Sequence, residues 1–423
     1  MSASAGGLSA LPVAGTKAQT TRRVGVIALV PDEWKSVWMP RQQILSRLGE
    51  HFDIVWMDPA ADWKEYWWPV WSRFHAKGFV QVTLGFSVAT SRGRWPLIFR
   101  PVWLRRWATR EALRAARQYL VGRGAEQIIL YLWRPEFASA IDLVQHDASC
   151  YHIDDEYSFS DVEQPNSAQE TDLIRRVDQV IVHSIRLREK KGAINPNTAL
   201  VPNGVDYEAF ATPRAEPADL AGVPRPRIGY VGVIKKQLNL ALLLRLARAR
   251  SDWNFVMVGP IGNISGKQQA LAGLQGLPNV HFLGEKPVNA VAAYTQHMDV
   301  CLMCYEANDY TKYIYPLKLH EYLASGRPVV STPLDSVLEH GDVVALAQTD
   351  GEWIAAIEQA LLQQGEAQRR SRQERARNYD WNSLASQVGA LLLERVASQT
   401  RANSGRARLA TAADVRPSHS HSS

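Results

Sequence analysis

Cysteine is scarce in this sequence, which has only Cys150, Cys301 and Cys304 among its 423 residues. An odd number of cysteines, without other metal ligands close in sequence, argues against a disulfide framework and against a zinc site. Cys301 and Cys304 belong to the apolar run VCLMCY, which is more typical of a buried strand than of a redox pair. This cysteine content is typical of a cytoplasmic protein.

Long hydrophobic runs are also missing, since no window of the sequence is apolar enough to span a bilayer. Residues 1–20 are small and polar and lack the hydrophobic core of a signal peptide. They and residues 399–423 have the composition of disordered tails. The full sequence is 46% hydrophobic and too long for one compact core, so we predict two domains.

Apolar segments of strand length alternate with helical segments along most of the chain. In the first half, strands are expected at 23–30, 52–56, 127–132, 148–153 and 179–183, with a helix at 41–48. The pattern continues with strands expected at 200–206, 227–232, 253–258, 280–282 and 299–303, and helices at 239–247, 288–297 and 381–398. Such alternation predicts parallel sheets with both faces covered. We predict an α/β protein of two doubly wound halves, joined near residues 206–225, with their strand ends facing a cleft.

The segment 315–332, YPLKLHEYLASGRPVVST, is the most informative part of the sequence. Its spacing predicts a helix from Pro316 to Ser325, followed by a short buried strand at 328–332. Free backbone N–H groups at the helix start and the charge of Lys318 favour a phosphate, and Glu321 can accept hydrogen bonds from sugar hydroxyls. The same spacing also fits an ordinary surface helix with a Lys–Glu pair, and spacing alone does not separate the two.

Five elements of the second half follow one another in a set order: VPNGVD, IGYVG, FVMVGP, NVHFLGEKP and the helix ending in ASGRPVVST. This series resembles the C-terminal half of GT-B glycosyltransferases of the group 1 set, sequence family four. It is most similar to bacterial exopolysaccharide enzymes that carry a P-x-K-x-x-E-Y-L-A-x-G-x-P-V-V block. The resemblance is close over residues 200–385 and looser over 22–200, where the strand order and YHIDDEYSF carry it. It implies a GT-B fold, with two Rossmann-like domains facing across a cleft.

The resemblance assigns donor contacts to the second half. Gly232 corresponds to the glycine that lets the backbone approach the diphosphate, which Lys318 would also meet. Glu321 corresponds to the glutamate that holds the ribose hydroxyls. The family's other glutamate position holds Tyr313, so the full E-x7-E pattern is lacking. Further donor-binding candidates, for which surface lysines or plain structural turns are the alternatives, are Lys235, Lys236, Gly259, Thr311 and Lys312.

Polar side chains follow two strands of the first half. Asp154 and Asp155 come directly after the strand 148–153, and His183 ends the strand 179–183. Carboxylates at a strand end that faces a cleft can orient acceptor hydroxyls or act as a base. These three residues are our candidate catalytic groups, with a solvated acidic loop and a structural histidine as alternatives. No acidic pair has the pattern of a metal site, so we expect no metal, and no cofactor besides the sugar-nucleotide substrate.

Tryptophan and arginine are concentrated in the first half. Residues 56–133 hold nine of the fourteen tryptophans, and residues 92–123 hold nine arginines against one acid, Glu111. A cationic, Trp-rich amphipathic segment favours the headgroup region of anionic membranes. The alternative is a helical region whose arginines pair elsewhere. No nucleic-acid-binding module accompanies the segment, so we expect no nucleic-acid partner.

These features predict an enzyme that moves a sugar from a nucleoside-diphosphate sugar to a hydroxyl of a lipid-linked or growing bacterial surface glycan. Family analogy favours retention of configuration without a metal. The Trp- and Arg-rich residues 92–123 predict a cytoplasmic protein bound peripherally at the inner face of the cytoplasmic membrane, where a polyprenyl-linked acceptor would be found. The alternatives are a GT-B relative with other chemistry, such as a sugar-nucleotide epimerase, and a non-catalytic nucleotide-sugar-binding assembly protein. The expected division is a tail (1–20), an acceptor-binding domain (21–205), a donor-binding domain (206–385), a terminal helix that returns to the first domain (386–398) and a second tail (399–423).

Overall fold

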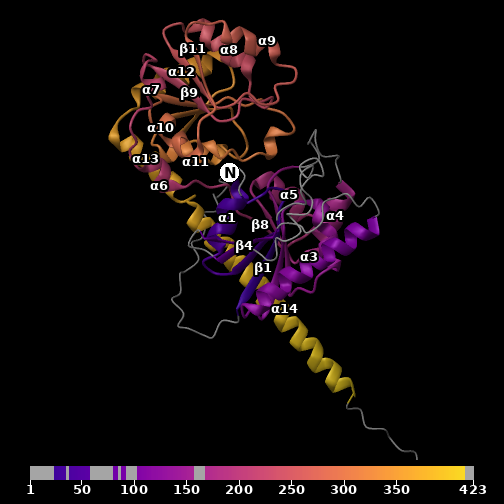
Figure 1. Cartoon of the computed structure of the whole chain (residues 1–423). Helices are drawn as coiled ribbons and strands as arrows, with labels where there is room; N and C mark the ends of the chain where they lie inside the picture. The colour runs from indigo at the N-terminus through magenta and orange to yellow at the C-terminus, as the bar shows by residue number, and fades with distance from the viewer. Residues whose placement is uncertain are drawn as a thin grey trace, which may run out of the picture.

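The computed structural model describes residues 23–34, 38–57, 80–83, 87–91, 102–156 and 167–414. They form two α/β lobes, one above the other in Figure 1, with a long terminal helix running along the lower lobe. The predicted N-terminal tail lies outside the described residues, as does the end of the chain from residue 415.

The N-terminal domain contains an eight-stranded sheet in the order β3-β4-β2-β1-β5-β6-β7-β8. Every neighbouring pair is parallel except β3 and β4, which are antiparallel. Central strands such as QIILYL are buried along their whole length, because helices cover both faces. The strands are β1 (Val24–Leu29), β2 (Asp53–Met57), β3 (Val80–Thr83), β4 (Ser87–Ser91), β5 (Gln127–Leu132), β6 (Ala148–Ile153), β7 (Gln179–Val182) and β8 (Thr198–Leu200). The helices are α1 (Pro40–Leu48), α3 (Val102–Gly122), η2 (Pro135–Asp142), α4 (Ser167–Arg176) and α5 (Ile185–Gly192).

The C-terminal domain contains a six-stranded parallel sheet in the order β11-β10-β9-β12-β13-β14. Counted from β9, this is the doubly wound order 3-2-1-4-5-6, so the predicted fold class is confirmed. The strands are β9 (Arg227–Val231), β10 (Asn254–Val258), β11 (Val280–Gly284), β12 (Val300–Met303), β13 (Val329–Ser331) and β14 (Val344–Leu346). The helices are α6 (Tyr207–Ala211), α7 (Ala218–Ala221), α8 (Leu240–Ala249), α9 (Gln268–Gln275), η4 (Val288–Ala290), α10 (Val291–Gln296), η5 (Thr311–Tyr313), α11 (Lys318–Ala324), η6 (Leu338–His340), α12 (Asp350–Leu362), α13 (Glu366–Arg377) and α14 (Trp381–Asp414).

The segment that connects the two domains, near residues 200–206, has a different secondary structure from the one predicted. The strand expected at 200–206 lies earlier, as β8, and Val205 makes only an isolated bridge with Asp380. A Cβ added at Gly204 would lie 2.5 Å from the carbonyl oxygen of Tyr379, so the two crossing segments touch backbone to backbone here. Close approach of the two backbone segments at Gly204 and Tyr379, rather than sheet pairing, therefore sets the conformation here.

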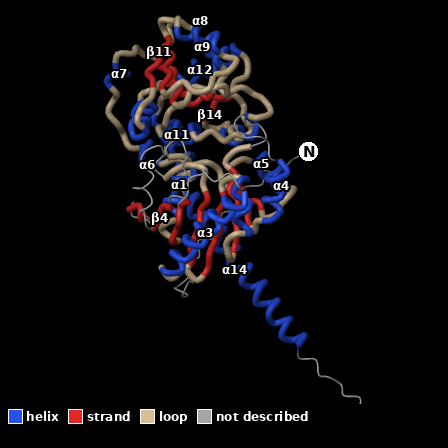
Figure 2. The backbone as a smooth tube through the Cα atoms, turned by 45° about the vertical axis from the view of Figure 1, so that its right-hand side comes forward, coloured by secondary structure: helices blue, strands red, loops and turns tan. Residues whose placement is uncertain are grey.

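Helix α14 leaves the C-terminal domain and packs along the N-terminal one, as Figures 1 and 2 both show. Its apolar side joins the N-terminal core through Leu384, Val388, Leu392 and Val396. Gln127 also donates a hydrogen bond to the Thr400 hydroxyl at 2.8 Å. The helix continues to Asp414, beyond the end expected at residue 398. The prediction of a disordered tail from residue 399 was therefore wrong as far as Asp414, because polar composition alone does not stop a helix that is already nucleated by packing.

Candidate functional site

Two glycine turns and Lys318 pack together where the C-terminal sheet changes winding direction. Gly232 follows β9 with φ of +140° and Gly259 follows β10 with φ of +135°, both conformations that L side chains rarely adopt. A Cβ at Gly232 would collide with Cε and Nζ of Lys318, and one at Gly259 would collide with the carbonyl of Gly232. Only glycine therefore fits at either position, and the lysine fills the space above the first turn.

Lys318 is a partly buried cation that forms no ion pair in the described part of the chain, although the charge of Glu321 acts on it. Its Nζ lies 5.2 Å from the ring centroid of Tyr230 and forms no hydrogen bond or ion pair with any described residue. Burial lowers the pKa of Lys318, and the charge of Lys235 lowers it further, while Glu321 opposes both. Burial also raises the pKa of Glu321, one turn along α11, against the effect of Lys318. A partly buried cation beside a glycine turn is suited to an anionic ligand.

The other donor-binding candidates have different surroundings. Lys235 is exposed, and Lys236 donates its main-chain N–H to the carbonyl of Asn263 at 2.8 Å. The Thr311 side chain is fully buried and its hydroxyl donates to the carbonyl of Glu306 at 2.6 Å. Lys312 forms an ion pair with Asp309 at 2.8 Å. Thr311 and Lys312 thus hold the loop between β12 and α11 together, and their donor role stays a prediction.

Asp154, Asp155 and His183 meet at the carboxyl ends of the adjacent strands β6 and β7. Asp155 accepts hydrogen bonds from the Glu156 N–H at 2.7 Å and from the Tyr310 hydroxyl of the C-terminal domain at 3.1 Å. Burial raises the pKa of Asp155, and these hydrogen bonds oppose the rise. Burial lowers the pKa of His183, whose Nδ1 lies 3.2 Å from the carbonyl oxygen of Ile153. The three residues predicted from sequence therefore form one group at the boundary between the domains.

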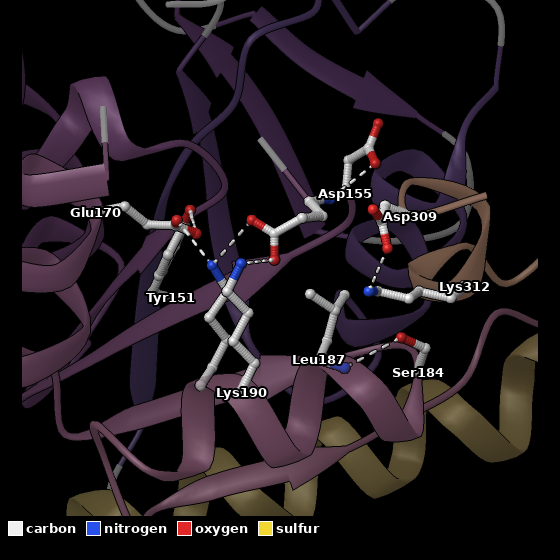
Figure 3. Close-up of polar contacts among 10 residues, drawn as sticks. Tyr151, Asp155, Glu170, Ser184, Leu187, Lys190, Asp309 and Lys312 are labelled. Atoms are coloured by element: carbon white, nitrogen blue, oxygen red, sulfur yellow. Dashed lines mark hydrogen bonds and ion pairs between the residues drawn. The ribbon is translucent and has the colours of Figure 1, made fainter. Parts of the chain in front are cut away.

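Glu156, the next residue, belongs to a buried ion network instead. Its carboxylate pairs with Lys190 at 3.1 Å and with Lys191 at 3.5 Å, and Lys191 also pairs with Glu170 at 2.8 Å (Figure 3). Tyr151 donates to Glu170 at 3.3 Å. This network anchors the loop that carries Asp154 and Asp155 to helix α5.

Sequence reasoning missed Arg41 and Tyr310. Arg41 of α1 is only 8% exposed and forms ion pairs with both Asp32 and Asp154. Its position in an amphipathic helix gave no signal, because a buried arginine has the same helical spacing as an exposed one. Tyr310 lies in an irregular loop, where no periodicity applies. Only the fold shows that these two residues reach the strand ends that carry the candidate catalytic group.

Among the described residues, no group of three or more His, Cys, Asp or Glu side chains could hold a metal ion. Over that same part of the chain, we find no helix with the length and hydropathy needed to cross a membrane. The three cysteines are free thiols buried in the two cores, as expected for strand residues.

Comparison with known proteins agrees with the doubly wound geometry. Residues 225–363 match the family described as "Glycosyl transferases group 1". The chain is 32% identical over 230 residues to the "Putative teichuronic acid biosynthesis glycosyltransferase TuaH" of Bacillus subtilis (strain 168). That match covers 51% of this chain and 57% of the relative, so the chain spans less than two thirds of the relative's length.

Solved structures match over most of the chain, at identities that show the fold alone. A structure described as "Trehalose-6-phosphate from E. coli bound with UDP-2-fluoro glucose" has a TM-score of 0.62 at 11% identity, covering 88% of this chain and 99% of that one. A glycosyltransferase from Rickettsia africae ESF-5 has a TM-score of 0.62 at 12% identity, covering 89% and 99%. The fold predicted from the sequence motifs is therefore confirmed as the GT-B arrangement.

Proposed function

Because the chain carries a glycosyltransferase group 1 domain within a GT-B fold, we propose that it transfers a sugar from a nucleoside-diphosphate sugar to a hydroxyl of a glycan. The observation that carries the proposal is Lys318, a partly buried cation packed over the Gly232 turn, which forms no ion pair among the described residues. A diphosphate would supply that partner. The description of TuaH as a teichuronic acid biosynthesis glycosyltransferase supports an acceptor in bacterial surface polysaccharide synthesis. We further propose that this acceptor is lipid-linked or growing and lies at the inner face of the cytoplasmic membrane.

In the proposed reaction, the bond between the sugar C1 and the diphosphate oxygen breaks, and a bond from C1 to the acceptor oxygen forms. Negative charge grows on the leaving diphosphate, where Lys318 stabilises it. The acceptor hydroxyl is oriented by Asp155 and gives up its proton toward that carboxylate, which burial makes more basic. Glu321 accepts hydrogen bonds from the ribose. Family analogy supports retention of configuration without a metal ion.

Nucleotide sugars offered to the full chain test this function directly. We expect one of them to raise the melting temperature of the protein. A ligand at a hundred times its Kd adds about 2.7 kcal/mol to the free energy of unfolding. With glycan acceptors from a membrane extract, label from that sugar should appear in a larger product as nucleoside diphosphate is released. Asp155→Asn should abolish product formation and leave the thermal shift intact.

The same assay separates the alternatives. Label recovered in an isomerised sugar nucleotide would identify an epimerase. Tight binding without sugar release, even with extract present, would identify the non-catalytic assembly protein, which the replacement of a family glutamate by Tyr313 makes possible. Either result would contradict glycosyl transfer.

The exposed side of α3 supports our proposal that the protein binds to anionic membranes. Trp103 is 71% exposed and Trp107 50% exposed, while Leu113 and Leu120 of the same helix lie in the core. Arg106 and Arg110 are exposed on the same side as the tryptophans. The earlier part of the Trp- and Arg-rich segment, residues 92–101, lies outside the described residues.

Removing two of these arginines should weaken membrane binding. Each basic residue near an anionic membrane surface contributes about 1 kcal/mol to the binding free energy. The double variant Arg106→Gln, Arg110→Gln should therefore lower the affinity for anionic vesicles by roughly thirtyfold. Sedimentation with phosphatidylglycerol vesicles, at low and high salt, measures the loss. Leu362→Ser, at an 80% exposed site on α12, is the control and should bind as the parent does. Equal binding by the arginine variant would exclude this helix as the contact.

A further inference from the structure

The loop between β12 and α11 reaches from the C-terminal domain to the candidate catalytic group of the other domain. The Tyr310 hydroxyl donates to Oδ2 of Asp155 at 3.1 Å. The main chain of Tyr313 acts to raise the pKa of His183, and the Tyr313 ring centroid lies 5.2 Å from Nζ of Lys190. Figure 3 draws Asp155 and, from this loop, Asp309 with its ion-pair partner Lys312. The donor-binding domain thus supplies groups to the carboxyl ends of β6 and β7.

The loop holds Tyr310 in place by its own hydrogen bonds. Oδ1 of Asn308 accepts from the N–H groups of Tyr310 and Thr311, both at 3.0 Å. The Thr311 hydroxyl donates to the carbonyl of Glu306 at 2.6 Å and accepts from the N–H of Asn308 at 2.9 Å. These bonds lie entirely within the C-terminal domain. The position of the Tyr310 backbone therefore does not depend on its contact with Asp155.

We propose that Tyr310 is a positioning residue, which completes the acceptor-hydroxyl site on Asp155 from the opposite domain. The inference rests on the proposed function, and specifically on Asp155 as the group that meets the acceptor. Among the described residues, each Asp155 oxygen accepts one hydrogen bond, from Glu156 of the same loop or from Tyr310 across the interface. Each carboxylate oxygen has a second lone pair, which is left to receive a sugar hydroxyl. The site is complete only when the two domains are together.

Charged groups from every neighbouring element act on Asp155. Burial raises the pKa of Asp155 most, and the charge of Asp154 adds to the rise. The hydrogen bonds from Glu156 and Tyr310 and the charge of His183 lower that pKa. Arg41 of α1 is paired with Asp154. Loss of the Tyr310 hydroxyl should therefore raise the pKa of Asp155 further, because one stabilising donor to the ionised form is gone.

Tyr310→Phe tests the inference in the full chain. Asp155 acts in its ionised form, so activity is lost as pH falls through its pKa, and a higher pKa starts that loss at higher pH. Loss of this hydrogen bond favours the protonated form of Asp155, so the acid limb of kcat/KM for the acceptor should move to higher pH. The acceptor KM should rise, while the donor KM and the nucleotide-induced thermal shift stay unchanged.

Tyr294→Phe is the matched control. It also removes a tyrosine-to-aspartate hydrogen bond in the same domain, the 2.7 Å contact with Asp219 between α10 and α7, and should leave the pH profile as it is. An acid limb that does not move in Tyr310→Phe would overturn the positioning role, while product analysis of the parent enzyme would still stand. Full activity of Asp155→Asn would show that Asp155 is not the group that meets the acceptor. That result would overturn the inference without contradicting sugar transfer itself.

Discussion

Replacing Lys318 with methionine is expected to remove nucleoside-diphosphate binding and to lower turnover by about a hundredfold to a thousandfold, the cost of losing one charge-stabilising donor at a reacting centre. Methionine keeps the length of the side chain that fills the space above Gly232. Without ligand, we expect little net change in stability, because the variant loses a partly desolvated ammonium group while Glu321 loses the charge that opposes the rise of its pKa. Calorimetry with the nucleoside diphosphates and thermal melts of the apo protein measure both effects.

The pH dependence of nucleoside-diphosphate binding tests the role of Lys318 independently. Burial lowers the pKa of Lys318 in the free protein, and a bound diphosphate would raise it again. Affinity should therefore be full below the free-protein pKa and fall as pH rises through it. Between the free and bound pKa values, binding takes up a proton, which calorimetry in two buffers of different ionisation enthalpy detects. Lys235→Met, which removes an exposed lysine nearby, should lose far less affinity. An equal loss in both variants would contradict the special role of Lys318.

The positions of the donor-site candidates could be predicted because their signals are local in sequence. Gly232 ends a strand that alternates with helices, and Lys318 and Glu321 lie within one turn of a single helix. Strand ends, glycine turns and helix starts are features of consecutive residues, so their spacing predicts them. Even here the helix begins at Lys318 rather than at Pro316, with the Leu319 N–H bonded to the Pro316 carbonyl at 3.2 Å in a tighter first turn.

The acceptor side could be predicted only in part, because its remaining groups come from distant segments. Asp154, Asp155 and His183 were found as strand ends, but Tyr310 contacts Asp155 across 155 positions of sequence. Arg41 reaches Asp154 from α1, across most of the N-terminal domain's sequence. No periodic pattern relates such residues. Their meeting depends on which strands are neighbours and on how the two domains face each other, which only the fold supplies.

Replacing Lys191 with methionine is expected to destabilise the N-terminal domain by about 3–5 kcal/mol, the usual cost of removing one partner from a buried ion pair. The side chain of Lys191 is 3% exposed and lies between Glu156 and Glu170, which are 1% and 7% exposed. Without the lysine, Glu170 keeps only the Tyr151 hydroxyl at 3.3 Å among the contacts of this network. A buried carboxylate would then lack its counter-charge.

The neighbouring lysine provides a close control for this prediction. Lys190 pairs with the same Glu156, but its side chain is 42% exposed, so Lys190→Met should cost about 1 kcal/mol or less. Adding Glu170→Gln to Lys191→Met should recover part of the lost stability, because the uncompensated charge is removed along with its partner. Urea denaturation of all four proteins measures the free energies of unfolding. Equal destabilisation by the two lysine variants, or no recovery in the double variant, would show that the network does not hold the Asp154–Asp155 loop through buried charge.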